Sequence, residues 1–139
     1  MKKNKKSYWQ LTVRSDFSSA HALRNYKGKC ENLHGHNYQV EMTVEGTKLS
    51  TDVELIVDFS LLKKLLKKAV DLLDHKNINE FPPFDTINPS AENLACFLYK
   101  EIEKLFESDL KEIEHIDSIH LYSVSVSEKA QQTATYREI

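Results

Sequence analysis

The chain has 139 residues, of which 40% are hydrophobic and 29% charged, and its formal net charge is −2. This length suits one domain with its own core, and a charge near zero argues against a general nucleic-acid binder, which needs a basic excess. No apolar run approaches the length of a membrane span. The chain is therefore expected to be cytoplasmic, with neither a membrane nor a nucleic acid as partner.

The start of the chain predicts a tail and two strands. Residues 1–7 are rich in lysine with no apolar stretch behind them, so a disordered basic tail is expected. The predicted single domain covers residues 8–139. Alternating apolar and polar residues predict strands over Tyr8–Ala20 and His36–Glu45. A loop over His21–Leu33 separates them.

The middle of the chain predicts two helices. A third short strand is expected before them, over Val53–Val57. Apolar residues at helical spacing predict a helix over Asp58–Asp74. After a loop with three prolines, Ser90 is a suitable N-cap for a helix that runs to about Phe106. The residues expected to face the core are Phe59, Leu62, Leu65, Leu66, Ala69, Val70 and Leu73 in the first helix, and Leu94, Phe97, Leu98, Ile102 and Leu105 in the second.

Two strands close the chain, over Ile116–Ser127 and Thr133–Arg137. With strands at both ends and helices between them, we expect an α+β fold with an antiparallel four-stranded sheet and two helices on one face. The edge strands of such a sheet lack a cover, so pairing with other subunits is expected.

The histidines between positions 21 and 36 carry the most specific signal. Alternate residues of a strand point to the same side, so His34 and His36 can direct both imidazoles to one point while Gly35 faces away. A third imidazole from His21 completes a set of three nitrogen ligands with an open fourth position, as in catalytic zinc sites. Zn²⁺ is therefore the expected cofactor, although iron, copper and nickel also accept imidazole.

Cys30 lies beside Lys29 and close to His34, and positive neighbours favour the thiolate form of a cysteine. The spacing leaves three interpretations open: a catalytic base, an ordinary loop thiol, or a fourth metal ligand that would close the site. Cys96 lies in an apolar helical stretch and is expected to pack as a small hydrophobic residue.

Two further positions carry weaker signals. Asp74 and His75 end the first predicted helix, where the helix dipole alone would stabilise a protonated histidine. Glu128 continues the apolar side of the strand that contains Val124 and Val126. A carboxylate there needs a pair of donors, such as a guanidine-like edge of a ligand, unless the strand has reached solvent.

Taken together and in this order, these features resemble the 6-pyruvoyl-tetrahydropterin synthase / 6-carboxy-tetrahydropterin synthase family, from about Tyr8 to Arg137. The resemblance implies a tunnelling fold (T-fold), in which subunits join their sheets into a trimeric barrel. Two trimers then form a homohexamer (a dimer of trimers) with active sites at subunit boundaries. The segments that carry the resemblance are Phe17–His21, Cys30, His34–His36, Val57–Phe59, Leu73–His75, Asn88–Ala95, Glu128 and Tyr136–Arg137.

The resemblance also implies roles for individual residues. The zinc ligands would be three histidines: His21, His34 and His36. Cys30 would be the catalytic base, assisted by Asp74 and His75 of a neighbouring subunit. Glu128 would anchor the guanidine-like edge of the pterin.

The spacing Cys-x3-His-Gly-His is similar to that of the 6-carboxy-5,6,7,8-tetrahydropterin synthases of queuosine (7-deazaguanine) biosynthesis. Their implied substrate is 7,8-dihydroneopterin triphosphate, which such a lyase would convert with loss of triphosphate and of acetaldehyde. Cys30 is followed by Glu31, and this doublet resembles a mixed subgroup that also serves folate synthesis. With Glu31 as the base, the expected product is 6-hydroxymethyl-7,8-dihydropterin.

The sequence leaves other functions open. The chain could be a non-catalytic homologue that binds a pterin or a metal. It could also be a hydrolase that uses a zinc-bound water, with Glu31 as the nearby carboxylate. Three basic residues of the loop could bind the triphosphate: Arg24, Lys27 and Lys29. The alternative is that they belong to a solvated loop without this role.

Overall fold

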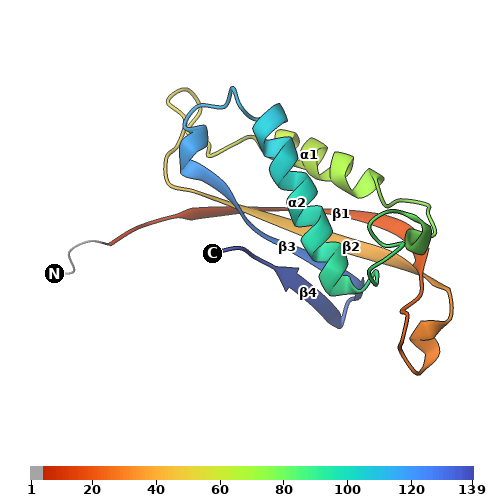
Figure 1. Ribbon diagram of the computed structural model, residues 1–139. Coiled ribbons are helices and arrows are strands. Elements are labelled where there is room, and N and C mark those ends of the chain that lie inside the picture. The colour runs from red at the N-terminus through yellow and green to blue at the C-terminus, as the bar shows by residue number, and fades with distance from the viewer. Residues whose placement is uncertain (1–4) are drawn as a thin grey trace.

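The computed structural model describes residues 5–139, so the first four residues of the predicted tail lie outside the described residues. Four antiparallel strands form one sheet in the order β1–β2–β3–β4 (Figure 1). This confirms the predicted α+β fold. The elements are β1 (Trp9–His21), β2 (His34–Gly46), α1 (Phe59–Asp71), α2 (Ala91–Asp109), β3 (Ile119–Lys129) and β4 (Gln132–Tyr136).

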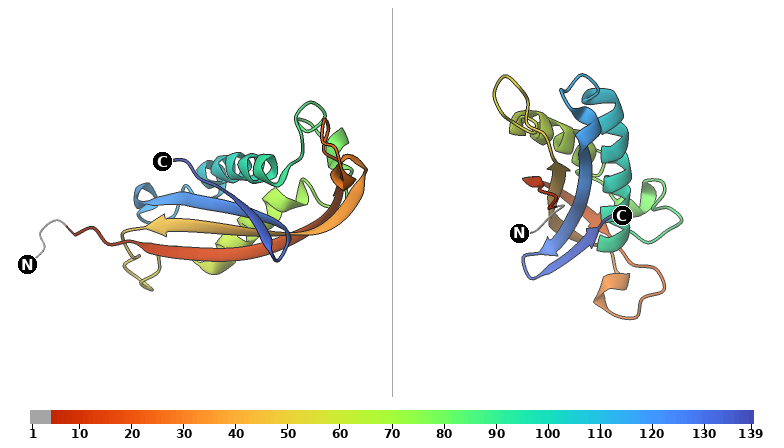
Figure 2. Two further views of the ribbon diagram at one scale, coloured as in Figure 1. Left: turned by 90° about the horizontal axis from the view of Figure 1, so that it is seen from below. Right: turned by 90° about the vertical axis from the view of Figure 1, so that its left-hand side faces the viewer.

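Both helices cover the same face of the sheet, with α1 against β1 and α2 against β3 and β4 (Figures 1 and 2). The apolar stripes predicted for the two helices meet the sheet there, because residues at helical spacing share one face. Phe59 is an exception, since it is 51% exposed at the first turn of α1. The buried residues of the helices are Leu62, Leu65, Leu66, Ala69, Val70, Leu94, Ala95, Leu98, Tyr99 and Ile102.

Side chains fix where the helices begin. The Asp58 carboxylate accepts a hydrogen bond from the backbone N–H of Ser60, at 2.8 Å. The Ser90 hydroxyl accepts one from the N–H of Asn93, at 3.2 Å. Each side chain satisfies a backbone donor that the helix itself leaves unpaired. The first helix ends earlier than predicted, so Asp74 and His75 lie in the turn that follows it.

The strand predicted over Val53–Val57 is wrong. This segment forms a turn instead, in which the N–H of Ser50 bonds the carbonyl of Leu55 at 2.8 Å. Glu54 has a φ of 58°, which a strand cannot accommodate. Val53 is 62% exposed, and only the last two apolar residues of the segment are buried in the core. Within residues 5–139, no strand of the sheet pairs with this segment.

Two bulges interrupt β3. Thr43 pairs with Ser123 and Val44 with Leu121, so Tyr122 has no partner on β2. A second register shift leaves Glu128 without a partner on β4. A bulge bends its strand and redirects the side chain of the extra residue. The second bulge therefore sets the direction of Glu128.

The C-terminal part of β1 is not a free edge. The N–H of His75 bonds the carbonyl of Ser18 at 2.6 Å, and the N–H of Ala20 bonds the carbonyl of Lys76 at 2.9 Å. The chain after α1 thus pairs with β1 where that strand approaches His21. Within residues 5–139, no helix has the length and apolar character needed to cross a membrane.

Adjacent leucines of α1 test the packing of the helix on the sheet. Leu62 is fully buried, whereas Leu61 is 36% exposed. We expect L62A to lower the free energy of unfolding by about 2–5 kcal/mol, because it leaves a cavity, and L61A to lower it by less than about 1 kcal/mol. Urea unfolding at one protein concentration measures both. Equal losses in the two variants would contradict the packing described here.

Candidate metal centre

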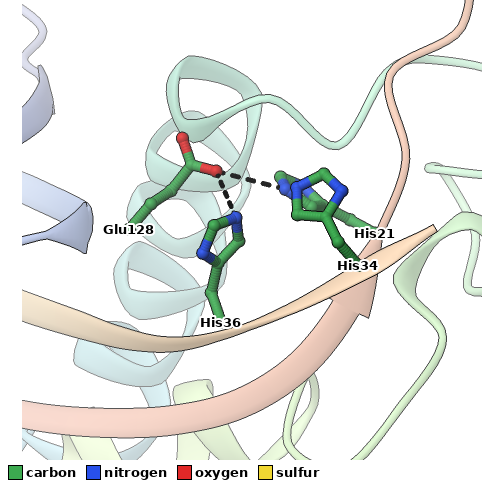
Figure 3. Close-up of side chains that lie close together, drawn as sticks. All are labelled: His21, His34, His36 and Glu128. Carbon is green, nitrogen blue, oxygen red and sulfur yellow. Dashed lines mark ion pairs between the residues drawn. The ribbon is translucent and has the colours of Figure 1, made fainter. Parts of the chain in front are cut away.

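Three imidazoles meet on the helix-covered face at one end of the sheet (Figure 3). His21 ends β1 and pairs directly with His34, the first residue of β2, and His36 lies two residues further along the same face. The ring centroids of His21 and His34 are 4.6 Å apart, those of His34 and His36 are 4.8 Å apart, and those of His21 and His36 are 5.1 Å apart. The strand register therefore brings together the three side chains that the sequence singles out.

Glu128 joins this group from β3. Its Oε2 atom lies 3.1 Å from Nε2 of His21 and 3.0 Å from Nε2 of His36 (Figure 3). One ligand atom from each of His21, His34, His36 and Glu128 lies within 4.8 Å of the others. Among residues 5–139, these four side chains form the group that could hold a metal ion.

Hydrogen bonds fix the tautomers of two of the histidines. Nδ1 of His21 lies 2.7 Å from the carbonyl oxygen of Pro89, and Nδ1 of His34 lies 2.7 Å from that of Asn32. A carbonyl oxygen only accepts, so both Nδ1 atoms carry the hydrogen. In a neutral ring, Nε2 then presents its lone pair to the centre of the cluster. Backbone carbonyls orient metal-binding histidines in the same way.

The electrostatics of the cluster also suit a cation. Burial is the main cause that lowers the pKa of His36, which favours its neutral form. Nε2 of His21 and of His36 is buried and makes no hydrogen bond within the described part of the chain. Neutral imidazoles facing a carboxylate are a donor set for a divalent ion.

Tyr38 lies beneath the cluster, and the sequence analysis did not identify it as a site residue. Its ring is 5.7 Å from that of His21 and 5.4 Å from that of His36. The side chain is fully buried, and burial raises the pKa of its phenol. Its hydroxyl makes no hydrogen bond to any residue of the described chain. The apolar alternation of β2 contained this position but gave no sign of a role.

A network of asparagines holds the loop that supplies the Pro89 carbonyl. Asn88 accepts from the N–H of Arg24 at 2.8 Å and donates to its carbonyl at 3.0 Å. Asn79 makes the same pair of bonds with Ala22, at 2.8 and 2.9 Å. The chain that leaves His21 is thereby fastened to the loop before α2. The guanidinium of Arg24 donates to three carbonyl oxygens of that loop, those of Asn79, Phe84 and Ile87.

The structure places Cys30 and Glu31 in a short 3₁₀ turn, Lys29–Glu31, within the loop between β1 and β2. Cys30 is a half-exposed free thiol and Glu31 is exposed. The side chain that accompanies the imidazoles is that of Glu128 rather than Cys30. The loop nonetheless connects the two strands that end and begin at the cluster.

Asp74 and His75 lie apart from the cluster, at the outer edge of β1. Asp74 accepts from the N–H of Ser18 at 2.9 Å and contacts Nδ1 of His75 at 3.0 Å. The sequence places the two residues next to each other but does not predict this contact between their side chains. The hydrogen bond from Ser18 is the main cause that lowers the pKa of Asp74. The His75 side chain is 82% exposed.

The sequence is similar to a known protein family and to proteins within it. A family model described as 6-pyruvoyl tetrahydropterin synthase matches residues 10–139. The 6-pyruvoyl tetrahydrobiopterin synthase of Dictyostelium discoideum is 36% identical, over 91% of this chain and 94% of its own. The 6-carboxy-5,6,7,8-tetrahydropterin synthase of Rickettsia typhi is 35% identical, over 70% of this chain and 83% of its own.

A solved structure extends the likeness to three dimensions. The 6-pyruvoyl tetrahydropterin synthase of Plasmodium vivax superposes with a TM-score of 0.72 at 27% identity, covering 96% of this chain and 99% of its own. The same Plasmodium protein has also been solved with a catalytic glutamate replaced by alanine.

Asn88 tests whether the loop network positions His21. We expect N88A to weaken zinc binding by about 10-fold, because losing an outer partner misorients a metal-binding histidine. T86A is a matched control, since Thr86 lies in the same loop and bonds only the carbonyl of Pro83. Competition with a chelating dye measures the zinc dissociation constant of each variant. Unchanged affinity in N88A would show that Asn88 has no influence on the cluster.

Proposed function

The chain belongs to the 6-pyruvoyl tetrahydropterin synthase family, and from this premise we propose that it is a zinc-dependent 6-carboxy-5,6,7,8-tetrahydropterin synthase. Its proposed substrate is 7,8-dihydroneopterin triphosphate, and its proposed pathway is queuosine (7-deazaguanine) biosynthesis. The observation that carries the proposal is the convergence of His21, His34 and His36 on one point. The relative from Rickettsia typhi, a 6-carboxy-5,6,7,8-tetrahydropterin synthase, supports this choice of product.

The donor set supports zinc. Nitrogen atoms of three histidines are a ligand set found in catalytic zinc sites, and two of the rings already have the tautomer that leaves Nε2 free to bind. When bound there, zinc would supply Lewis-acid polarisation to oxygen atoms of the substrate side chain.

The surroundings of Glu128 support a pterin site. Glu128 lines a cavity of about 370 Å³, together with Ala91, Glu92 and the segment 132–135. A carboxylate can accept two parallel N–H bonds from a guanidine-like edge. Glu128 would therefore hold the pterin ring in this cavity while the substrate side chain extends toward the imidazoles.

We assign the base to Cys30, whose thiolate would remove a proton from the substrate side chain. Asp74 and His75 would assist from a neighbouring subunit of a homohexamer. The geometry within one chain supports the contribution of His75 by a neighbouring subunit. His75 is exposed at the outer edge of β1 and is not a member of the histidine cluster.

A second candidate product is 6-hydroxymethyl-7,8-dihydropterin, with Glu31 as the base. The adjacent Cys30-Glu31 pair favours it, since both side chains lie on the same short turn. The catalytic glutamate of the Plasmodium vivax relative shows that a carboxylate serves in one member of this family.

Mass spectrometry of the products from 7,8-dihydroneopterin triphosphate tests the proposal directly. We expect zinc-loaded protein to form the 6-carboxy product, and we expect C30A to lose about 10²–10⁴-fold in that rate, as for removal of a general base. E31A should keep the 6-carboxy product and lose any 6-hydroxymethyl product. A C30A variant with full carboxy-product formation would remove the thiolate from the scheme.

The same measurement separates the other functions. Zinc-loaded protein without turnover would indicate a non-catalytic homologue that binds a pterin or a metal. Loss of phosphate alone, with the pterin side chain intact, would indicate a hydrolase that uses a zinc-bound water.

Subunit mixing tests the shared site. C30A and H75A should each be inactive alone, because each lacks one part of every site. If Cys30 and His75 act together across a subunit boundary, random reassembly of the two variants should restore about a quarter of wild-type activity. Refolding the mixed variants, followed by an activity assay, measures this. Recovery no greater than in separately refolded variants would place both residues in one subunit.

A further inference from the structure

The contact between Glu128 and His21 joins two atoms that both offer lone pairs. Nδ1 of His21 carries the ring hydrogen, because it faces the carbonyl of Pro89 at 2.7 Å. In the neutral ring, Nε2 therefore has no hydrogen to give to the carboxylate oxygen 3.1 Å away. A second nitrogen, Nε2 of His36, lies 3.0 Å from the same oxygen. Such an arrangement is favourable when a cation lies between these atoms.

The distances suit ligands of a single ion. Around a tetrahedral zinc ion with bonds of about 2.0–2.1 Å, neighbouring ligand atoms lie about 3.3 Å apart. The two Glu128 contacts, at 3.0 and 3.1 Å, are close to that separation. Neither nitrogen makes a hydrogen bond within the described part of the chain. Oε2 of Glu128 thus lies near ligand separation from two of the three imidazoles, and one ligand atom from each of the four side chains lies within 4.8 Å of the others.

Glu128 also belongs to the cavity on its other side. It lines the space of about 370 Å³ that is bordered by the start of α2 and by β4. It is the extra residue of a bulge and has no partner on β4. The carboxylate therefore stands between the histidine cluster and the cavity proposed for the pterin.

We propose that Glu128 is the fourth metal ligand of the substrate-free site and leaves the metal when a pterin enters the cavity. This inference rests on the zinc site and the pterin substrate of the proposed function. The guanidine-like edge of the pterin supplies two N–H donors, and these replace the metal as the partner of the carboxylate. The exchange breaks one metal–carboxylate contact and forms one bidentate pair.

This exchange couples recognition to reactivity. A site with four protein ligands is closed, whereas a catalytic site keeps one position open. With Glu128 on the metal, small anions and water have no free position. Once the pterin ring holds Glu128, that position becomes available beside the side chain of the correctly seated molecule.

Cobalt substitution gives a readout other than activity. Co²⁺ reports its ligands through its visible absorption bands, and azide binds where a position is open. We expect the bands of wild-type cobalt protein to be unchanged by azide. Adding unsubstituted pterin, which has the guanidine-like edge but no side-chain hydroxyls, should make them shift with azide. The bands of the cobalt-loaded E128A variant should shift with azide in the absence of pterin. E128Q serves as a second variant, in which the side chain keeps its size.

A matched control is E41A, which removes a carboxylate of β2 that pairs with Arg14 and is not a member of the cluster. Its cobalt protein should remain insensitive to azide, as the wild type does. Wild-type bands that shift with azide alone would overturn the inference and leave the zinc site intact. Bands that stay insensitive although pterin binds, as measured by equilibrium dialysis, would also overturn it. Protein that takes up no cobalt at all, by elemental analysis, would instead overturn the metal site of the proposed function.

Discussion

The register between β1 and β2 is the constraint on which the site depends. Side chains alternate between the two faces of a sheet, so a slip of one residue would turn His34 and His36 away from His21. Apolar contacts further along the same strands hold this register. Phe17 stacks on Tyr38 at 4.6 Å directly behind the cluster, and both rings are buried. The convergence of the three imidazoles is therefore a property of the sheet core.

The sheet alone does not determine which nitrogen of each ring faces the centre. That choice comes from backbone carbonyls outside the sheet, at Pro89 and Asn32. The loop that carries Pro89 is far from β1 in the sequence and is fastened to it by Asn79, Asn88 and Arg24. These side chains bond backbone groups, so they act through the position of the loop. The direction of the three imidazoles thus depends on the packed sheet, and the tautomer of His21 depends on a loop held by a polar network.

Much of this could be predicted from the sequence, because the decisive patterns are local. Alternation in β2 sets the common face of His34 and His36, and helical spacing sets the inward faces of α1 and α2. The position of Glu128 beside the histidines could not be predicted, since a bulge arises from the hydrogen-bond register between strands and leaves no mark on composition. The prediction for Val53–Val57 failed because strand pairing depends on distant parts of the chain, and in the described part of the chain no strand pairs with this segment.

The placement of His75 bears on how a complete site is assembled. Its backbone lies in the left-handed region, with a φ of 55°, which costs about 1–3 kcal/mol for a residue other than glycine. The N–H bond to Ser18 and the contact with Asp74 hold it there, although its ring is mostly exposed. A strained backbone that fixes an exposed imidazole is of little use to packing within the chain. It suits a group that is presented in a fixed orientation to another subunit, which is the role that the proposed shared site requires.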